Sequence, residues 1–272
     1  MKNIALGQYY PSNSPLHKLD PRVKIIIAIL YIVCSFLCKN IISFALLALS
    51  AIVLIALGRI PLKVVLGGLR PVLIILIFTA VINIFWTSGE TLLFEYRFIS
   101  IYLEGIYSAV FIVVRITALI IGTCMLMTYT TTPIELTDSI EDLLSPLKKI
   151  HLPVHEFAMM MTIALRFIPT LVEETEKIMT AQKARGVDFT SGSIVKRAKA
   201  LIPILIPLFV SSFNRAADLA TAMECRCYHG GDGRTRMKVR HVRFVDFIPL
   251  VLILILGAAL VTLNFLNIGY TM

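Results

Sequence analysis

The chain has 272 residues, of which 57% are hydrophobic and 16% are charged, and its mean hydropathy is +0.84. Soluble domains contain about 45–50% apolar and about 25% charged residues, so this composition excludes an ordinary soluble protein and predicts an integral membrane protein. The formal net charge is +9, but zinc-finger, RNP and helix-turn-helix patterns are missing from the polar stretches, so no nucleic acid is expected as a partner.

Five largely uncharged apolar segments predict five transmembrane helices, since a bilayer core of about 30 Å needs roughly 20 helical residues. The first helix is entered through Asp20 and Pro21, a favourable N-cap and a favourable first helical residue. In chain order, the segments are residues 25–38, 41–57, 71–88, 105–129 and 247–267. Residues 1–129 are therefore interpreted as an N-terminal segment with four transmembrane helices, and residues 247–272 as the last one.

Residues 130–246 form a block of different character, which contains six prolines and most of the charge. Apolar residues at helical spacing from Leu136 to Leu147 predict an amphipathic helix. Two long helices are expected next, over about residues 154–185 and 194–226. The apolar run at residues 200–214 is too short to cross a bilayer, so we expect a re-entrant or buried helix there. The predicted fold class is all-α, with about five transmembrane helices plus long amphipathic helices on the cytoplasmic side.

The basic residues predict the topology of the chain. If the N-terminus is cytoplasmic, the inside segments are residues 1–24, 58–71 and 129–243, and they hold 23 of the 26 Lys and Arg residues. The long block follows the positive-inside rule poorly, but the two short inside segments still outnumber the outside ones by 7 to 2. We therefore predict a multi-pass protein of the cell membrane with a cytoplasmic N-terminus and an external C-terminus.

The two long helices are expected to end in similar ways. The first ends at Ala184-Arg185-Gly186 and the second at Cys225-Arg226-Cys227, so that small residues flank an arginine in each. Small neighbours allow another backbone to approach closely, and arginine offers a planar fork of hydrogen-bond donors for a carboxylate. Two similar helix ends suggest two similar sockets on a partner. Alternatively, each arginine neutralises the C-terminus of its own helix.

Several segments resemble the transmembrane T component of energy-coupling factor transporters, the vitamin-uptake branch of the ABC superfamily. No single segment is sufficient, but together they lie in order across most of the chain. They are residues 7–9, 14–24, 132–138, 165–171, 181–186, 215–220 and 222–224.

The resemblance implies a non-catalytic scaffold in a multisubunit complex. Its partners would be two cytoplasmic ATPase subunits, identical or related, one small substrate-binding membrane subunit, and membrane lipid. ATP and Mg²⁺ would be bound by the ATPases, so no cofactor and no metal are expected in this chain. The residues that would dock the ATPases are Ala184, Arg185, Gly186, Cys225, Arg226 and Cys227, supported by Gln182, Lys183 and Glu224. The family's second motif is usually Ala-Arg-Gly, so Cys227 puts the close-packing role of its last glycine in doubt.

Other features have alternative interpretations. Cys225, Cys227 and His229 form C-x-C-x-H, but a fourth ligand and the usual C-x₂-C spacing are missing for zinc. Arg115 lies within a predicted span, where burial against carbonyls or a carboxylate is favoured over a functional role. The basic run at residues 234–243 favours attraction to anionic lipid headgroups.

A membrane-embedded enzyme and a stand-alone secondary transporter are the rival classes. An enzyme would need clustered titratable residues near one membrane face, but the five histidines are scattered and the acidic residues of 135–142 favour a solvated helix face. A secondary transporter would need charged groups near the bilayer midplane, and Arg115 is the single charged residue within the predicted spans. The transported substrate cannot be read from this chain, because specificity in the resembled family belongs to another subunit.

Overall fold

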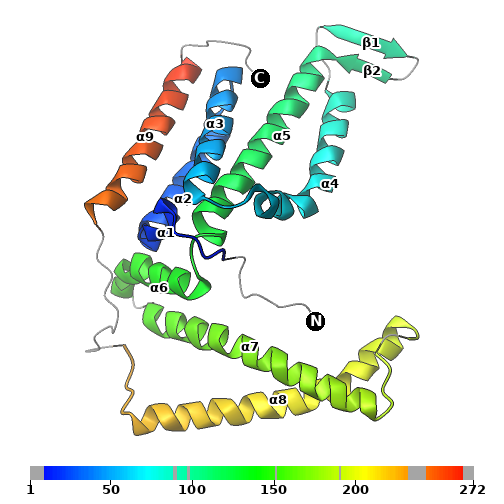
Figure 1. The fold of residues 1–272 in the computed structure, drawn as a ribbon, viewed down its shortest axis with the longest axis vertical. Coiled ribbons are helices and arrows are strands. Elements are labelled where there is room, and N and C mark those ends of the chain that lie inside the picture. The colour runs from blue at the N-terminus through cyan, green and yellow to red at the C-terminus, as the bar shows by residue number, and fades with distance from the viewer. Residues whose placement is uncertain are drawn as a thin grey trace. The chain divides into compact units, whose positions relative to one another are not determined.

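The computed structural model describes residues 9–87, 91–96, 99–150, 152–189, 191–231 and 243–265 (Figure 1). These residues fall into two compact units. The membrane unit comprises the described residues up to Leu136 and those from Arg243 onward. The crossed-helix unit comprises the described residues from Thr137 to Gly231. Helices dominate both units, which confirms the all-α fold class.

In the membrane unit, α2, α3, α5 and α9 pack together, and α4 packs against α5. A β-hairpin that the sequence analysis did not predict joins α4 to α5, with antiparallel pairing of Tyr96 to Ile99. The elements of this unit are α1 (Pro15–Lys18), α2 (Pro21–Leu37), α3 (Ile41–Gly58), α4 (Leu62–Trp86), β1 (Leu92–Tyr96), β2 (Ile99–Tyr102), α5 (Leu103–Thr123), a π-helical turn (Cys124–Thr128) and α9 (Phe244–Phe265).

Four described helices are long and apolar enough to cross a membrane: α3, α4, α9 and α5 with its π-helical turn. The first of the five predicted spans, α2, is not among them, because it has 17 residues. At 1.5 Å per residue it reaches about 25 Å, less than a bilayer core of about 30 Å. The structure therefore supports four of the five predicted spans by length and composition. The side of the membrane on which each terminus lies stays a prediction.

The predicted start of the third span is wrong. We expected its first helical residue to be Pro71, but α4 already begins at Leu62, with Pro61 at the N-cap. Pro71 lies inside the helix, where it has no N–H to donate to the carbonyl of Gly67, and such a proline kinks a helix without ending it. Figure 1 shows α4 as two arms at an angle.

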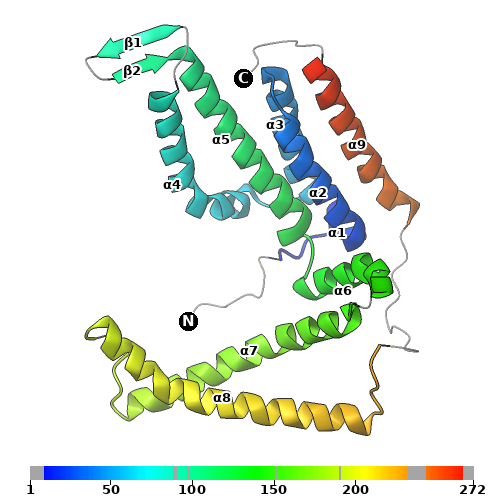
Figure 2. The ribbon, with the colours of Figure 1, turned by 180° about the vertical axis from the view of Figure 1, so that it is seen from behind.

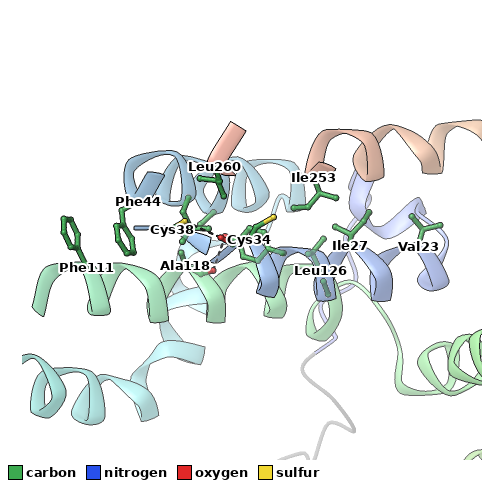
Figure 3. Packing of buried hydrophobic residues seen from close by; sticks show 14 residues of the cluster. Val23, Ile27, Cys34, Cys38, Phe44, Phe111, Ala118, Leu126, Ile253 and Leu260 are labelled. Carbon is green, nitrogen blue, oxygen red and sulfur yellow. Dashed lines mark hydrogen bonds between the residues drawn. The ribbon is translucent and has the colours of Figure 1, made fainter. Parts of the chain in front are cut away.

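The core of the membrane unit surrounds α2 (Figure 3). Tyr31 is 1% exposed and donates a hydrogen bond to the carbonyl of Ala118 on α5 over 3.3 Å. Gly122, one turn further along α5, lies directly against the Tyr31 ring, and a Cβ there would overlap the ring. Phe44 of α3 and Phe111 of α5 stack with ring centroids 4.6 Å apart. This packing holds α2, α3 and α5 together.

Two buried polar clusters tie the ends of the membrane helices together. Lys24 is 1% exposed, and its Nζ donates to the Thr130 carbonyl over 2.9 Å and to the Thr130 and Thr131 hydroxyls over 3.2 Å each. Asp246, at the start of α9, accepts from the backbone N–H of Asp20 over 3.3 Å and from that of Arg243 over 2.7 Å. These contacts hold the beginning of α2 against both the segment that follows α5 and the beginning of α9.

Three helices and one 3₁₀ turn are described between residues 133 and 225. α6 (Pro133–Leu144) confirms the predicted amphipathic helix and starts with a capping box, in which Thr132 and Glu135 each accept from the other's backbone N–H. After the 3₁₀ turn (Ser145–Ile150) come α7 (Val154–Ala184) and α8 (Ile194–Cys225), which confirm the two predicted long helices.

The apolar run at residues 200–214 differs from the prediction. It is not a separate buried helix but part of α8, the predicted long helix, which continues through Pro203 and Pro207. Ile204 is the buried residue of α8, and the large apolar side chains around it are exposed on this unit. Figure 2 shows α8 bent in its first half, as expected for two prolines within a helix.

Candidate functional site

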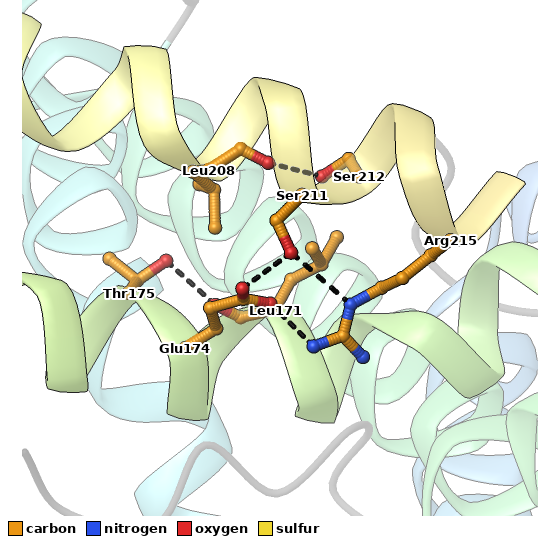
Figure 4. Close-up of polar contacts among 7 residues, drawn as sticks. All are labelled: Leu171, Glu174, Thr175, Leu208, Ser211, Ser212 and Arg215. Atoms are coloured by element: carbon orange, nitrogen blue, oxygen red, sulfur yellow. Dashed lines mark hydrogen bonds and ion pairs between the residues drawn. The ribbon is translucent and has the colours of Figure 1, made fainter.

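The predicted docking residues lie at the ends of two crossed helices. Figures 1 and 2 show α7 and α8 crossing, so that their C-terminal ends lie at opposite ends of the pair. At the crossing, a carboxylate oxygen of Glu174 accepts from the guanidinium of Arg215 over 2.7 Å (Figure 4). Its other oxygen accepts from the Ser211 hydroxyl over 2.5 Å. This polar contact joins the C-terminal third of α7 to the C-terminal third of α8.

The end of α7, which we call tip 1 (residues 182–187), is a Schellman motif. The N–H of Gly186 donates to the Lys183 carbonyl over 2.9 Å, and the N–H of Val187 donates to the Gln182 carbonyl over 3.1 Å. Gly186 has φ = +85°, the left-handed conformation that this motif requires. Arg185 is the C-cap, so its side chain leaves the helix where the backbone turns away.

The end of α8, tip 2 (residues 223–228), has the same backbone pattern. The N–H of Cys227 donates to the Glu224 carbonyl over 2.9 Å, and the N–H of Tyr228 donates to the Met223 carbonyl over 3.1 Å. Arg226 is again the C-cap, and Cys227 has φ = +53°. Cysteine therefore takes the left-handed conformation that glycine takes in tip 1. The alignment of the two helix ends, predicted from residue types, extends to their hydrogen bonds.

The two tips also share a pattern of exposure. The residues that flank each arginine are exposed, as is each arginine itself. Half-buried residues occupy the matching outer positions, Gln182 and Val187 in tip 1, and Met223 and Tyr228 in tip 2. An apolar contact between these two positions commonly accompanies a Schellman motif. Val187 and Tyr228 were not predicted as part of the site, although the aligned spacing of the two tips could have identified them.

The three predicted supporting residues differ in their contacts. Gln182 reaches across to α8, and its Nε2 lies 3.5 Å from the carbonyl oxygen of Pro203. Lys183 and Glu224 are exposed, and their backbone carbonyls accept the hydrogen bonds that close the two motifs. Tip 2 additionally borders a groove of about 430 Å³, to which Met159 and Ile163 of α7 contribute.

The structure bears on the Cys/His motif and on Arg115. Cys225 and Cys227 are exposed free thiols, and within the described ranges no three His, Cys, Asp or Glu side chains converge as metal ligands. Arg115 donates to the Cys38 carbonyl over 2.8 Å and lies 5.1 Å from the Phe44 ring centroid, as the burial interpretation predicts. The basic run at 234–243 falls outside the described residues except for Arg243.

Comparisons with known proteins find one matching family model and many similar sequences. The family model CbiQ, described as a cobalt transport protein, matches residues 12–238. A protein of Ruminiclostridium cellulolyticum named energy-coupling factor transporter transmembrane protein EcfT is 53% identical over 251 residues, which cover 92% of each chain. Proteins of the same name from Clostridium kluyveri and Bacillus subtilis are 51% and 47% identical, over 94% and 96% of this chain and 95% and 98% of their own.

Proposed function

The chain belongs to the family of energy-coupling factor transporter transmembrane proteins, and from this premise we propose that it is the coupling subunit of such a transporter. In this proposal it links ATP hydrolysis by two cytoplasmic ATPase subunits to movement of a small substrate-binding membrane subunit. The cargo would be a vitamin or another micronutrient. ATP and Mg²⁺ would be bound by the ATPases, and this chain would contribute mechanical linkage rather than chemistry.

The observation that supports the proposal best is the pair of matching tips. Each tip presents an exposed arginine at a helix C-cap, closed by the same two backbone hydrogen bonds. Two equivalent arginines at opposite ends of one crossed pair suit two similar sockets, one on each ATPase. An arginine that forms a charge-assisted hydrogen bond with a socket carboxylate would contribute about 1.5–3 kcal/mol.

The connection between the tips would transmit motion. Because Glu174 and Arg215 join α7 to α8, a change in the separation of the two ATPases would change the angle between the helices. α8 also exposes large apolar side chains, including Leu205, Phe209 and Phe213. We propose that this apolar surface contacts the substrate-binding subunit, since soluble surfaces rarely expose such a patch without a partner.

The decisive experiment removes both arginines at once. We expect the Arg185→Glu, Arg226→Glu double variant to lose ATP-driven uptake in vesicles that contain all subunits, and to lose co-purification with the ATPases. The physical reason is that each substitution replaces an attraction to a socket carboxylate with repulsion. Lys177→Glu is the matched control, because Lys177 is an exposed cation on α7 that lies eight positions before Arg185 and belongs to neither tip. Uptake by the double variant at the parent rate would refute the docking role.

A second measurement separates this proposal from the two rival classes. The chain purified alone should show neither catalytic turnover nor substrate transport, and uptake should appear only after the ATPases and a substrate-binding subunit are added. Transport by the lone chain in vesicles would favour a secondary transporter instead.

A further inference from the structure

An apolar groove runs along the membrane unit between α3 and α9. It has a volume of about 300 Å³, and residues of α1, α2 and the π-helical turn complete its lining. The polar side chains in the lining are those of Tyr31 and Ser50, and both form hydrogen bonds within the protein. Ser50 donates to the Leu47 carbonyl over 2.6 Å and lies 3.3 Å from the Tyr31 hydroxyl. The groove therefore offers little to water and suits an apolar occupant.

The surroundings of the groove indicate what that occupant is. Both α3 and α9 are apolar enough to cross a membrane. The lining residues Leu49, Val53 and Leu252 are 55%, 46% and 60% exposed, so the groove opens toward whatever surrounds these two helices. In a bilayer, that surrounding is hydrocarbon, and a lipid acyl chain is the molecule available to fill the groove.

Three exposed basic residues lie close in the chain to residues that line the groove. The lining includes Leu16, Leu57 and Pro249. In the chain, the exposed basic residues near these three positions are Lys18, Arg59 and Arg243, respectively. α1 contacts α3, and Asp246 ties the backbone of Arg243 to that of Asp20, so these chain segments meet at the same end of the unit.

Two carboxylates among these chain segments, Asp20 and Asp246, are buried. Asp246 is 4% exposed, and its two oxygens accept the backbone N–H groups of Asp20 and Arg243. Asp20 is itself 7% exposed and caps α2 through the N–H of Arg22. The accessible charge at this end of the groove is therefore positive.

We propose that the groove is a binding site for an anionic phospholipid. One acyl chain lies between α3 and α9, and the phosphate-bearing headgroup lies against Lys18, Arg59 and Arg243. Near a membrane surface, each lysine or arginine contributes about 1 kcal/mol toward an anionic lipid, which corresponds to about fivefold in affinity. The site requires that α2, α3 and α9 lie in a bilayer, but it does not depend on the coupling role of the tips.

The test measures which lipid the full chain retains. The chain is reconstituted with equal amounts of phosphatidylglycerol and phosphatidylcholine, extracted in mild detergent, and examined by native mass spectrometry. We expect at least fivefold preferential retention of phosphatidylglycerol. The Lys18→Gln, Arg243→Gln double variant should lose most of this preference. Lys39→Gln removes an exposed charge at the opposite end of α2 and should leave it unchanged.

A second pair of variants tests the groove itself. Val53→Trp places an indole in the lining and should reduce retention of both lipids at least fivefold. Ile52→Trp adds the same group to the neighbouring position, which is 62% exposed and outside the lining, and should retain lipid like the parent. Equal retention of the two lipids by the parent would overturn the headgroup assignment. Undiminished retention by Val53→Trp would overturn the groove as the site.

Discussion

Cys227 and Gly186 occupy equivalent positions in the two tips, but their backbone conformations cost different amounts. A residue with a Cβ pays roughly 1 kcal/mol or more in the left-handed region, and glycine does not. We therefore expect Cys227→Gly to stabilise the end of α8 by about 0.5–1 kcal/mol and Gly186→Ala to destabilise the end of α7 by a similar amount. A Cβ on Gly186 would meet no atom within 4 Å, so this cost is conformational rather than steric.

Hydrogen exchange at the two helix ends measures this difference. Peptides that cover tip 2 should exchange more slowly in Cys227→Gly than in the parent, and peptides that cover tip 1 faster in Gly186→Ala. Cys225→Ala is the matched control, because Cys225 is the last residue of α8 and needs no left-handed conformation. Unchanged exchange at tip 2 in Cys227→Gly would show that the cysteine is not strained there.

Lys24 is the residue whose structural role the sequence concealed most completely. We grouped it with the cytoplasmic positive charges, but it is buried, and its ammonium group donates to three oxygens of Thr130 and Thr131. Lys24→Met keeps the aliphatic stem but leaves the buried Thr130 carbonyl without this donor, which costs about 1–3 kcal/mol. We expect the variant to melt several degrees below the parent in a thermal-shift measurement. Lys63→Met, at an exposed lysine, should melt like the parent, and equal melting of both variants would contradict the role of Lys24.

At the scale of the helices, the contact between α7 and α8 depends on few polar groups. Glu174 and Arg215 are 21% and 38% exposed, so solvent screens their attraction, and we expect a coupling energy of about 0.5–1 kcal/mol. A double-mutant cycle with Glu174→Gln and Arg215→Met, read by thermal unfolding of the full chain, measures it. Glu173→Gln changes an exposed neighbour and should show no coupling to Arg215→Met. If Glu173→Gln shows the same coupling energy to Arg215→Met as Glu174→Gln does, the effect comes from long-range charge and not from the contact between Glu174 and Arg215.

The helix ends show which elements a sequence predicts and why. Asp20 with Pro21 and Gly186 are local signals, because capping chemistry and left-handed φ depend on the residue itself, and the structure confirms both ends. The start of α4 depends on context, because a proline can either begin a helix or kink one, and Pro71 kinks it. The β-hairpin between α4 and α5 was missed, since its strands are short and adjoin long apolar helices.

The candidate site was predictable in its residues but not in its geometry. Residue types at the two helix ends identified both arginines, whereas the opposite placement of the tips follows from how α7 and α8 cross. The crossing brings Glu174 to Arg215, 41 positions apart in the chain, and no local pattern indicates this contact. The left-handed conformation of Cys227 was equally inaccessible, since cysteine has no preference for it.

At the scale of the whole molecule, the distribution of basic residues predicts that the tips face the cytoplasm, and the chain's own cysteines can test this. Cys225 and Cys227 are exposed on tip 2, whereas Cys34 and Cys38 are buried and Cys124 is half-buried within a membrane helix. A membrane-impermeant maleimide should therefore label the chain in inside-out vesicles and not in right-side-out vesicles. The Cys225→Ser, Cys227→Ser variant is the control and should lose the label in both. If the tips dock ATPases, bound ATPase should protect the same two thiols, because they flank Arg226. Labelling from the outside of intact cells would invert the topology and remove the tips from the reach of any cytoplasmic ATPase.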